Sequence, residues 1–261
     1  MKYKNLLAGM VIATTLTGCT TVADLMGADS TTLNLSAAQS YNQMLTEAKQ
    51  KQILDTTSAT YKKVNRVFLK MKPYADQLNQ TGQKFDWQVA VIKSNEINAY
   101  VAPGGKVVFY TGIVDTLKLT DDEVAAIMGH EMVHALEEHS KNKVGAQALT
   151  DLAVSIGSKY VGQSAGGYGG LLLDMGAQFG VGLSFSRNLE SRADKGGLML
   201  MARAGYNPNA AITLWQKMNA QDSRGNSVLN KFTSTHPTND DRIAVLQQLM
   251  PEAMTVYKAK K

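Results

Sequence analysis

The pentapeptide His130-Glu131-Met132-Val133-His134 constrains this chain more than any other feature. Its two histidines are four residues apart, so on a helix both imidazoles lie on one face and can hold one metal ion. The preceding residues predict that helix, because Thr120 can cap its amino end and Glu123 follows three residues later, as in a capping box. The pattern H-E-x-x-H therefore predicts a zinc site in which Glu131 can take a proton from the attacking water.

The alternative interpretation is a solvated pair of histidines on a polar helix. The chain has only four histidines, and three of them fall within ten residues, which favours the metal site. One of these, His139, is five residues beyond His134, so on a continuing helix it would point away from the pair. We therefore expect His139 at the surface or in ordinary packing.

A catalytic zinc needs a third protein ligand and one open position. Glu137 and Ser140 stand where a metzincin would carry glycine and histidine, so the third ligand must come from a distant segment. Glu190 and Asp194, four residues apart on a predicted helix, are the best candidates, although acidic residues so spaced are usually a solvated face. Glu190 can reach the metal, while Asp194 can accept a hydrogen bond from a ligating imidazole and fix its orientation.

These motifs resemble the gluzincin family of zinc metalloproteases that includes the CAAX prenyl proteases, the HtpX-type proteases and the mitochondrial Oma-type protease. The resemblance covers roughly residues 60 to 250. It is carried by His130-Glu131-x-x-His134, Glu190-x-x-x-Asp194, Ser234-Thr235-His236-Pro237, Asn98-Ala99-Tyr100 and Gly104-Gly105-Lys106-Val107-Val108-Phe109. The chain is most similar to the small outer-membrane lipoprotein members found in bacteria.

The resemblance implies roles for particular residues. One Zn²⁺ per chain would be held by His130, His134 and Glu190, with Glu131 as general base. His236 would have an active-site role, either as a donor to the oxyanion or as a ligand that fills the open position in a latent form. Arg192 departs from the pattern, because many relatives carry an acidic residue there, and we expect only a change of local charge.

The amino-terminal segment is typical of a lipoprotein precursor. A short basic region precedes an apolar stretch that is too short to span a bilayer and ends in Leu16-Thr17-Gly18-Cys19, which resembles a bacterial lipobox. Cys19 is the only cysteine, so it cannot form an internal disulfide; an uncleaved anchor or a buried thiol is the alternative. We expect a signal peptide over residues 1–18. Thr20 follows in place of aspartate, which by resemblance to sorting signals favours the outer membrane, facing the periplasm.

The mature chain is long enough for one core-forming domain. We expect a lipidated tether over 19–35 and a single metalloprotease domain over 36–261, with amino-terminal helices over 36–80 and a catalytic core over 83–250. The fold class expected is α+β, mostly helical and zincin-like, with a small β-sheet packed on the active-site helix. Apolar spacing and turn residues predict these elements: helices at 36–54, 57–78, 120–140, 208–218 and 239–250, and strands at 87–92 and 106–110.

Two further features affect function. An edge strand of the sheet could pair with an extended peptide. Eight glycines between residues 162 and 182 predict a loop followed by a closely packed helix, with a mobile lid as the alternative.

The charge balance excludes one class of partner. The net charge of +5 falls to +3 when Lys2 and Lys4 leave with the signal peptide, which gives no case for nucleic acid. We expect protein or peptide substrates, the membrane through the lipid anchor, and other envelope proteases or assembly machinery as candidate partners. The function expected is a zinc-dependent endopeptidase of the bacterial cell envelope that cleaves unfolded or misassembled proteins. The alternatives are a metal-stabilised periplasmic chaperone or assembly factor with latent proteolysis, and a structural lipoprotein with a vestigial motif.

Overall fold

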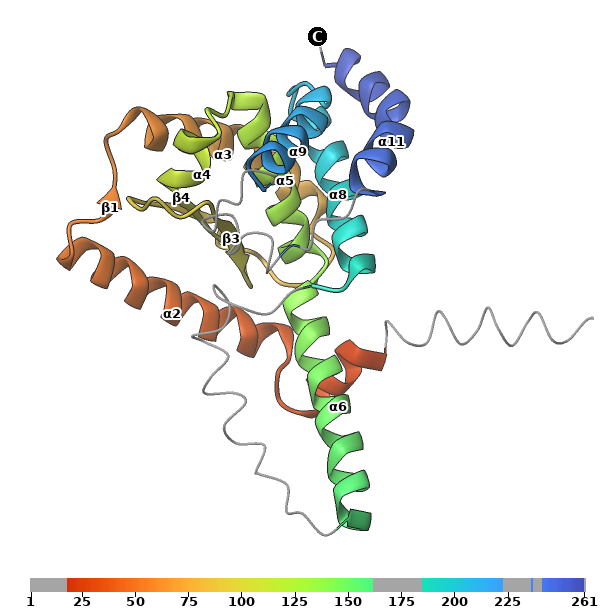
Figure 1. Ribbon diagram of the computed structural model, residues 1–261. Helices are drawn as coiled ribbons and strands as arrows, with labels where there is room; N and C mark the ends of the chain where they lie inside the picture. Colours follow the sequence, from red (N-terminus) through yellow and green to blue (C-terminus); the bar gives the residue numbers. More distant parts are fainter. Residues whose placement is uncertain (1–17, 162–184, 223–235, 237–240, 261) are drawn as a thin grey trace, which may run out of the picture.

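The computed structural model describes residues 18–161, 185–222, 236 and 241–260 (Figure 1). Its elements confirm the predicted fold class, α+β and mostly helical with a small sheet. In chain order they are α2 (Ser30–Gln50), β1 (Leu54–Asp55), α3 (Ala59–Leu78), β2 (Gln88–Ile92), β3 (Ala99–Ala102), β4 (Lys106–Tyr110), α4 (Thr111–Thr116), α5 (Asp121–Leu136), α6 (His139–Val161), α8 (Arg187–Arg203), α9 (Asn209–Asp222) and α11 (Asp241–Lys258).

The four strands form one mixed sheet in the order β1-β2-β4-β3. β2 and β4 are parallel, and the outer strands β1 and β3 pair antiparallel with them. Alternate side chains of β4 face opposite sides, as the pleat requires. Val107 and Phe109 join the main core with α3 and α5, whereas Val108 packs with Tyr41 and Ala48 of α2. The sheet therefore lies between α2 on one face and α3 and α5 on the other (Figure 1).

Helix α5 lies inside the molecule. Thr120 and Glu123 form the predicted capping box, in which each side chain bonds the backbone N–H of the other residue. Every residue from Glu123 to Ala135 is buried, because α3, α8, α9 and β3 all pack around this helix. A helix that is apolar on nearly all sides is stable only when it is enclosed in this way.

The prediction that this helix continues to residue 140 is wrong. α5 ends at Leu136, and Glu138 has a positive φ of 49°, so the chain turns before α6 begins at His139. No glycine marks this turn, so it could not be predicted from the residue types. The change of direction determines where His139 lies.

The amino-terminal helix begins earlier than predicted. Asp29 caps α2 by accepting a hydrogen bond from the backbone N–H of Thr32, so the helix starts at Ser30 and not at residue 36. Residues 18–25 are also helical. They lie against α6, where Asp24 pairs with Lys141 at 2.7 Å and the backbone of Cys19 passes over Gly145.

The other predicted strands and helices agree with the structure to different degrees. The predicted strands at 87–92 and 106–110 match β2 and β4 to within one residue. The last two helices are longer than predicted, since α9 ends at Asp222 and α11 at Lys258. The glycine-rich segment 162–182 lies outside the described residues. Among the helices that are described, none is both long and apolar enough to cross a bilayer.

Candidate metal centre

Two glycines let the two motif-bearing helices touch. A Cβ atom on Gly129 of α5 would lie 2.7 Å from the carbonyl oxygen of Gly197, and a Cβ on Gly197 of α8 would lie 2.6 Å from the amide nitrogen of His130. Real side chains do not tolerate such distances, so the backbones meet directly only because both residues are glycine. This close crossing places Glu190 and Asp194 of α8 opposite the histidines of α5.

Four buried side chains meet at this crossing: His130, His134, Glu190 and His236. Each offers one ligand atom, and these atoms all lie within 4.8 Å of one another. The Nε2 atoms of His130 and His134 are 3.0 Å apart. His236 Nδ1 lies 3.0 Å from a Glu190 oxygen and 3.2 Å from His130 Nε2. The group has the nitrogen and carboxylate donors that zinc prefers.

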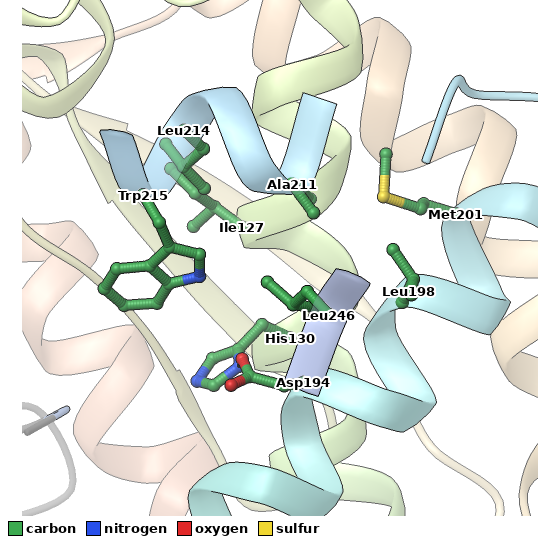
Figure 2. A pocket seen from close by; sticks show the side chains of 10 residues that line it. Ile127, His130, Asp194, Leu198, Met201, Ala211, Leu214, Trp215 and Leu246 are labelled. Atoms are coloured by element: carbon green, nitrogen blue, oxygen red, sulfur yellow. The ribbon is translucent and has the colours of Figure 1, made fainter. Parts of the chain in front are cut away.

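Asp194 contacts the outer nitrogen of His130. Figure 2 shows the two side chains next to each other. Both line a small, mostly apolar cavity of about 20 Å³. The carboxylate oxygen is 3.0 Å from His130 Nδ1, which leaves Nε2 facing the other ligands. This is the contact expected between a metal-binding imidazole and the carboxylate that orients it.

Arg242 of α11 completes this side of the centre, and the sequence analysis did not predict its role. Its guanidinium donates two hydrogen bonds to Asp194, at 2.6 and 2.7 Å, and lies 3.0 Å from Glu190. The same group stacks on the Trp215 ring at 3.8 Å. An arginine fork held in this way fixes both carboxylates, because its planar geometry matches them.

Glu131 lies next to the four ligands but is not one of them. It is 1% exposed, and one of its oxygens has no hydrogen-bond partner. His236 lies beside it, with 3.4 Å between Nε2 of His236 and Oε1 of Glu131. Burial raises the pKa of Glu131, although the charges of His236 and His130 oppose the shift. A buried carboxylate with a free lone pair is able to accept a proton from a substrate or a water.

His139 is not where we expected it. It is 1% exposed, and its Nδ1 lies 2.8 Å from Nδ1 of His134. The earlier expectation assumed a continuous helix; the turn at Glu138 returns the chain toward the site instead. Burial lowers the pKa of both His134 and His139, so both rings are neutral.

The charges of the centre fit a divalent cation. Burial lowers the pKa of His130, but its bonds to Asp194 and Glu190 outweigh this and raise the pKa to about 9. Without a metal ion, the extra proton on His130 therefore supplies one positive charge at the centre. A divalent metal ion would supply two. Glu131, Glu190 and Asp194 together carry three negative charges when ionised, and Arg242 with one divalent cation would balance them. Metal binding would displace the His130 proton.

The described residues thus form a metalloprotease-type centre, and comparison with known proteins gives its family. The model of peptidase family M48 matches residues 58–250, so the chain belongs to that family. Its metalloproteases use zinc, which agrees with the donor set.

Named relatives extend this finding. Mitochondrial metalloendopeptidase OMA1 of Schizosaccharomyces pombe is 37% identical over 167 residues, which are 64% of this chain and 48% of that protein. Metalloprotease LoiP of Escherichia coli is 28% identical over 268 residues, 96% of this chain and 98% of that protein. The beta-barrel assembly-enhancing protease of Yersinia pestis is 28% identical over 166 residues, 59% of this chain and 32% of that protein. The chain thus spans about half or less of the first and third relatives.

Proposed function

We propose that this chain is a zinc-dependent endopeptidase of the bacterial cell envelope. The convergence of His130, His134 and Glu190 beside a buried, incompletely hydrogen-bonded Glu131 carries the proposal. Membership of family M48 supports it, as do the relatives named as metalloproteases. Unfolded or misassembled proteins are the proposed substrates, because the Yersinia pestis relative is named for enhancing β-barrel assembly.

The three ligands would come from two helices, His130 and His134 from α5 and Glu190 from α8. When bound, zinc supplies a Lewis acid that polarises the scissile carbonyl and makes water more acidic. Asp194 and Arg242 hold the ligand side chains in place during turnover, so little reorganisation is needed.

Glu131 moves the proton. As the water oxygen attacks the carbonyl carbon, the Glu131 carboxylate accepts a proton from that water. It then donates the proton to the amide nitrogen as the C–N bond breaks, so the leaving group departs as a neutral amine. The raised pKa of Glu131 suits both steps, since a group that titrates nearer neutrality can accept and release a proton.

The substrate backbone is proposed to pair with β3. This strand forms one edge of the sheet. A small hollow lies between the end of β3 and the site, and its lining includes Val101 and Ala102 of the strand and His134 of the site. An extended peptide added to this edge would lie beside the ligands, with main-chain hydrogen bonds that do not depend on sequence.

Replacing Glu131 with glutamine tests the mechanism. We expect cleavage of casein and of an unfolded outer-membrane protein to fall by about 10²–10⁴-fold, because the amide cannot accept the proton. Zinc content by mass spectrometry should stay at one equivalent. Glu252→Gln, on the exposed face of α11, is the matched control and should cleave normally. Normal turnover by Glu131→Gln would refute the proposed role.

One observation favours a second candidate function. His236 Nδ1 lies 3.0 Å from Glu190, among the candidate ligand atoms, whereas a catalytic zinc keeps one position open for water. A chain locked in this way would be a metal-stabilised assembly factor with latent proteolysis. Wild-type protein that binds zinc yet cleaves neither substrate would support this second candidate.

Anchoring through Cys19 belongs to the same proposal. The thiol has no disulfide partner, and LoiP aligns with nearly the whole chain. We propose cleavage before Cys19, lipidation of that residue and residence in the outer membrane, facing the periplasm. Mass spectrometry of the mature protein should find an acylated Cys19 as the first residue. A chain that still carries Met1, or an unmodified Cys19, would contradict this.

A further inference from the structure

The outer nitrogen of His134 begins a chain of hydrogen bonds that leads away from the metal centre. His134 Nδ1 lies 2.8 Å from His139 Nδ1. On the far side of that ring, His139 Nε2 lies 3.0 Å from an oxygen of Glu137. The same Glu137 oxygen lies 2.6 Å from Nε of Arg192. The hydrogen-bonded residues come from α5, α6 and the turn between them, and Arg192 at the far end belongs to α8.

Only one arrangement of protons is compatible with this chain of hydrogen bonds when His134 binds a metal. A neutral imidazole that coordinates through Nε2 carries its hydrogen on Nδ1. His134 must therefore donate to His139 Nδ1, which accepts. The proton of His139 is then on Nε2 and is donated to the Glu137 carboxylate. Arg192 donates to that carboxylate from the other side and balances its charge.

His134 thus differs from its partner ligand. His130 donates directly to a carboxylate, Asp194. For His134 the carboxylate is Glu137, and a second imidazole stands between them. The turn at Glu138 creates this arrangement by bringing the start of α6 over the end of α5. Phe185 stacks on the His134 ring at 4.1 Å between centroids and limits its rotation from another side.

The outer end of the chain reaches the surface. The side chains of Glu137 and Arg192 are 30% and 42% exposed. Both line an open cleft of about 490 Å³ between α3, α5 and α8. Substitutions of Glu137 or Arg192 remove little buried surface, so they can test the hydrogen-bond chain without disturbing the core.

We propose that His139 is a positioning residue for the metal site, which accepts the His134 proton and is itself held by Glu137 and Arg192. This inference rests on the proposed zinc site. The contact with His139 would fix the tautomer and the ring orientation of His134, the second histidine ligand. Loss of such an outer contact typically weakens metal binding by about 10–100-fold.

The test measures zinc affinity of the purified chain by competition with a chromogenic chelator. His139→Leu keeps the bulk of the ring but offers no acceptor, and should weaken zinc binding by about 10–100-fold. His139→Asn retains an acceptor oxygen near the position of Nδ1 and should recover most of the affinity. The visible spectrum of the cobalt-loaded protein should change for leucine and resemble wild type for asparagine.

Glu137→Ala provides a second test at the exposed end, where a folding defect is not expected. It should weaken zinc binding by less than His139→Leu, because the His134 bond remains while His139 loses its acceptor. Glu252→Ala, which is exposed on α11, is the matched control and should bind like wild type.

Two outcomes would overturn the proposal. One is a folded His139→Leu that binds zinc within about threefold of wild type. The other is an asparagine variant that binds no better than leucine while Glu137→Ala has no effect. A wild type that binds zinc but does not cleave would refute only the peptidase activity, whereas a wild type that binds no zinc would refute both.

Discussion

His236 contacts both the ligand set and the general base. Its Nδ1 lies 3.0 Å from Glu190, and its Nε2 lies 3.4 Å from Glu131. These two contacts place the ring in the space between the ligand set and the carboxylate that would activate water. We propose that this arrangement is a closed form of the site, in which the ring must leave before a peptide bond can be attacked.

We expect His236→Ala to cleave casein faster than wild type. Removing the ring frees the fourth position, and the rate should rise roughly tenfold for each 1.4 kcal/mol by which the closed form is favoured. Zinc should remain bound, since three ligands are left. The comparison is made at equal zinc content in a continuous cleavage assay. A fall of about 10²–10³-fold would contradict this and assign His236 to stabilisation of the oxyanion.

Individual residues differ in how far the sequence could predict them. His130, Glu131 and His134 were predictable, because their spacing on a capped helix leaves few alternatives. Glu190 and Asp194 were predictable once a third ligand was needed. The five residues meet as expected, while their roles stay predictions. Arg242 and the His139 contact were not predictable, since both depend on how distant segments pack.

Helices α5 and α8 act as one unit, held together by their backbones. The Gly129–Gly197 contact sets the distance between the histidine pair and Glu190, and no side chain could replace either glycine without separation of the helices. Adjacent Gly196 is different, because the nearest atoms to a Cβ there belong to the side chain of Val133, the closest at 2.9 Å.

Gly197→Ala should therefore damage both the fold and the site. We expect a loss of about 1–3 kcal/mol in the free energy of unfolding, as for other overpacked contacts, together with weaker zinc binding. Gly196→Ala is the matched control on the same helix and should cost less, since a valine side chain can shift. Urea unfolding and chelator competition measure the two effects. Equal losses for both variants would show that the crossing distance is not what matters.

The elements show why the sequence predicts types better than boundaries. Regular spacing identified β2, β4 and most helices, whereas the short strands β1 and β3 were not predicted. Boundaries depend on single residues: Asp29 extends α2 by six residues, and the left-handed Glu138 divides one predicted helix into α5 and α6. Asp29 is a residue type that often caps helices, whereas nothing in the side chain of Glu138 signals a left-handed backbone.

In the described part of the molecule, the candidate metal site is buried where distant segments meet. Its candidate ligands come from α5, α8 and the segment that contains His236, and α11 supplies Arg242. A metal ion bound there would link helices that are distant in the chain. It would also stabilise the fold by about 4 kcal/mol at a free zinc concentration 1,000 times its dissociation constant.

Anomalous diffraction at the zinc absorption edge, from crystals of the purified full chain, addresses the central point directly. We expect a single strong peak about 2.0–2.2 Å from Nε2 of His130, Nε2 of His134 and a carboxylate oxygen of Glu190. A peak bound to other residues, or none in zinc-loaded crystals, would show that these side chains do not form a metal centre.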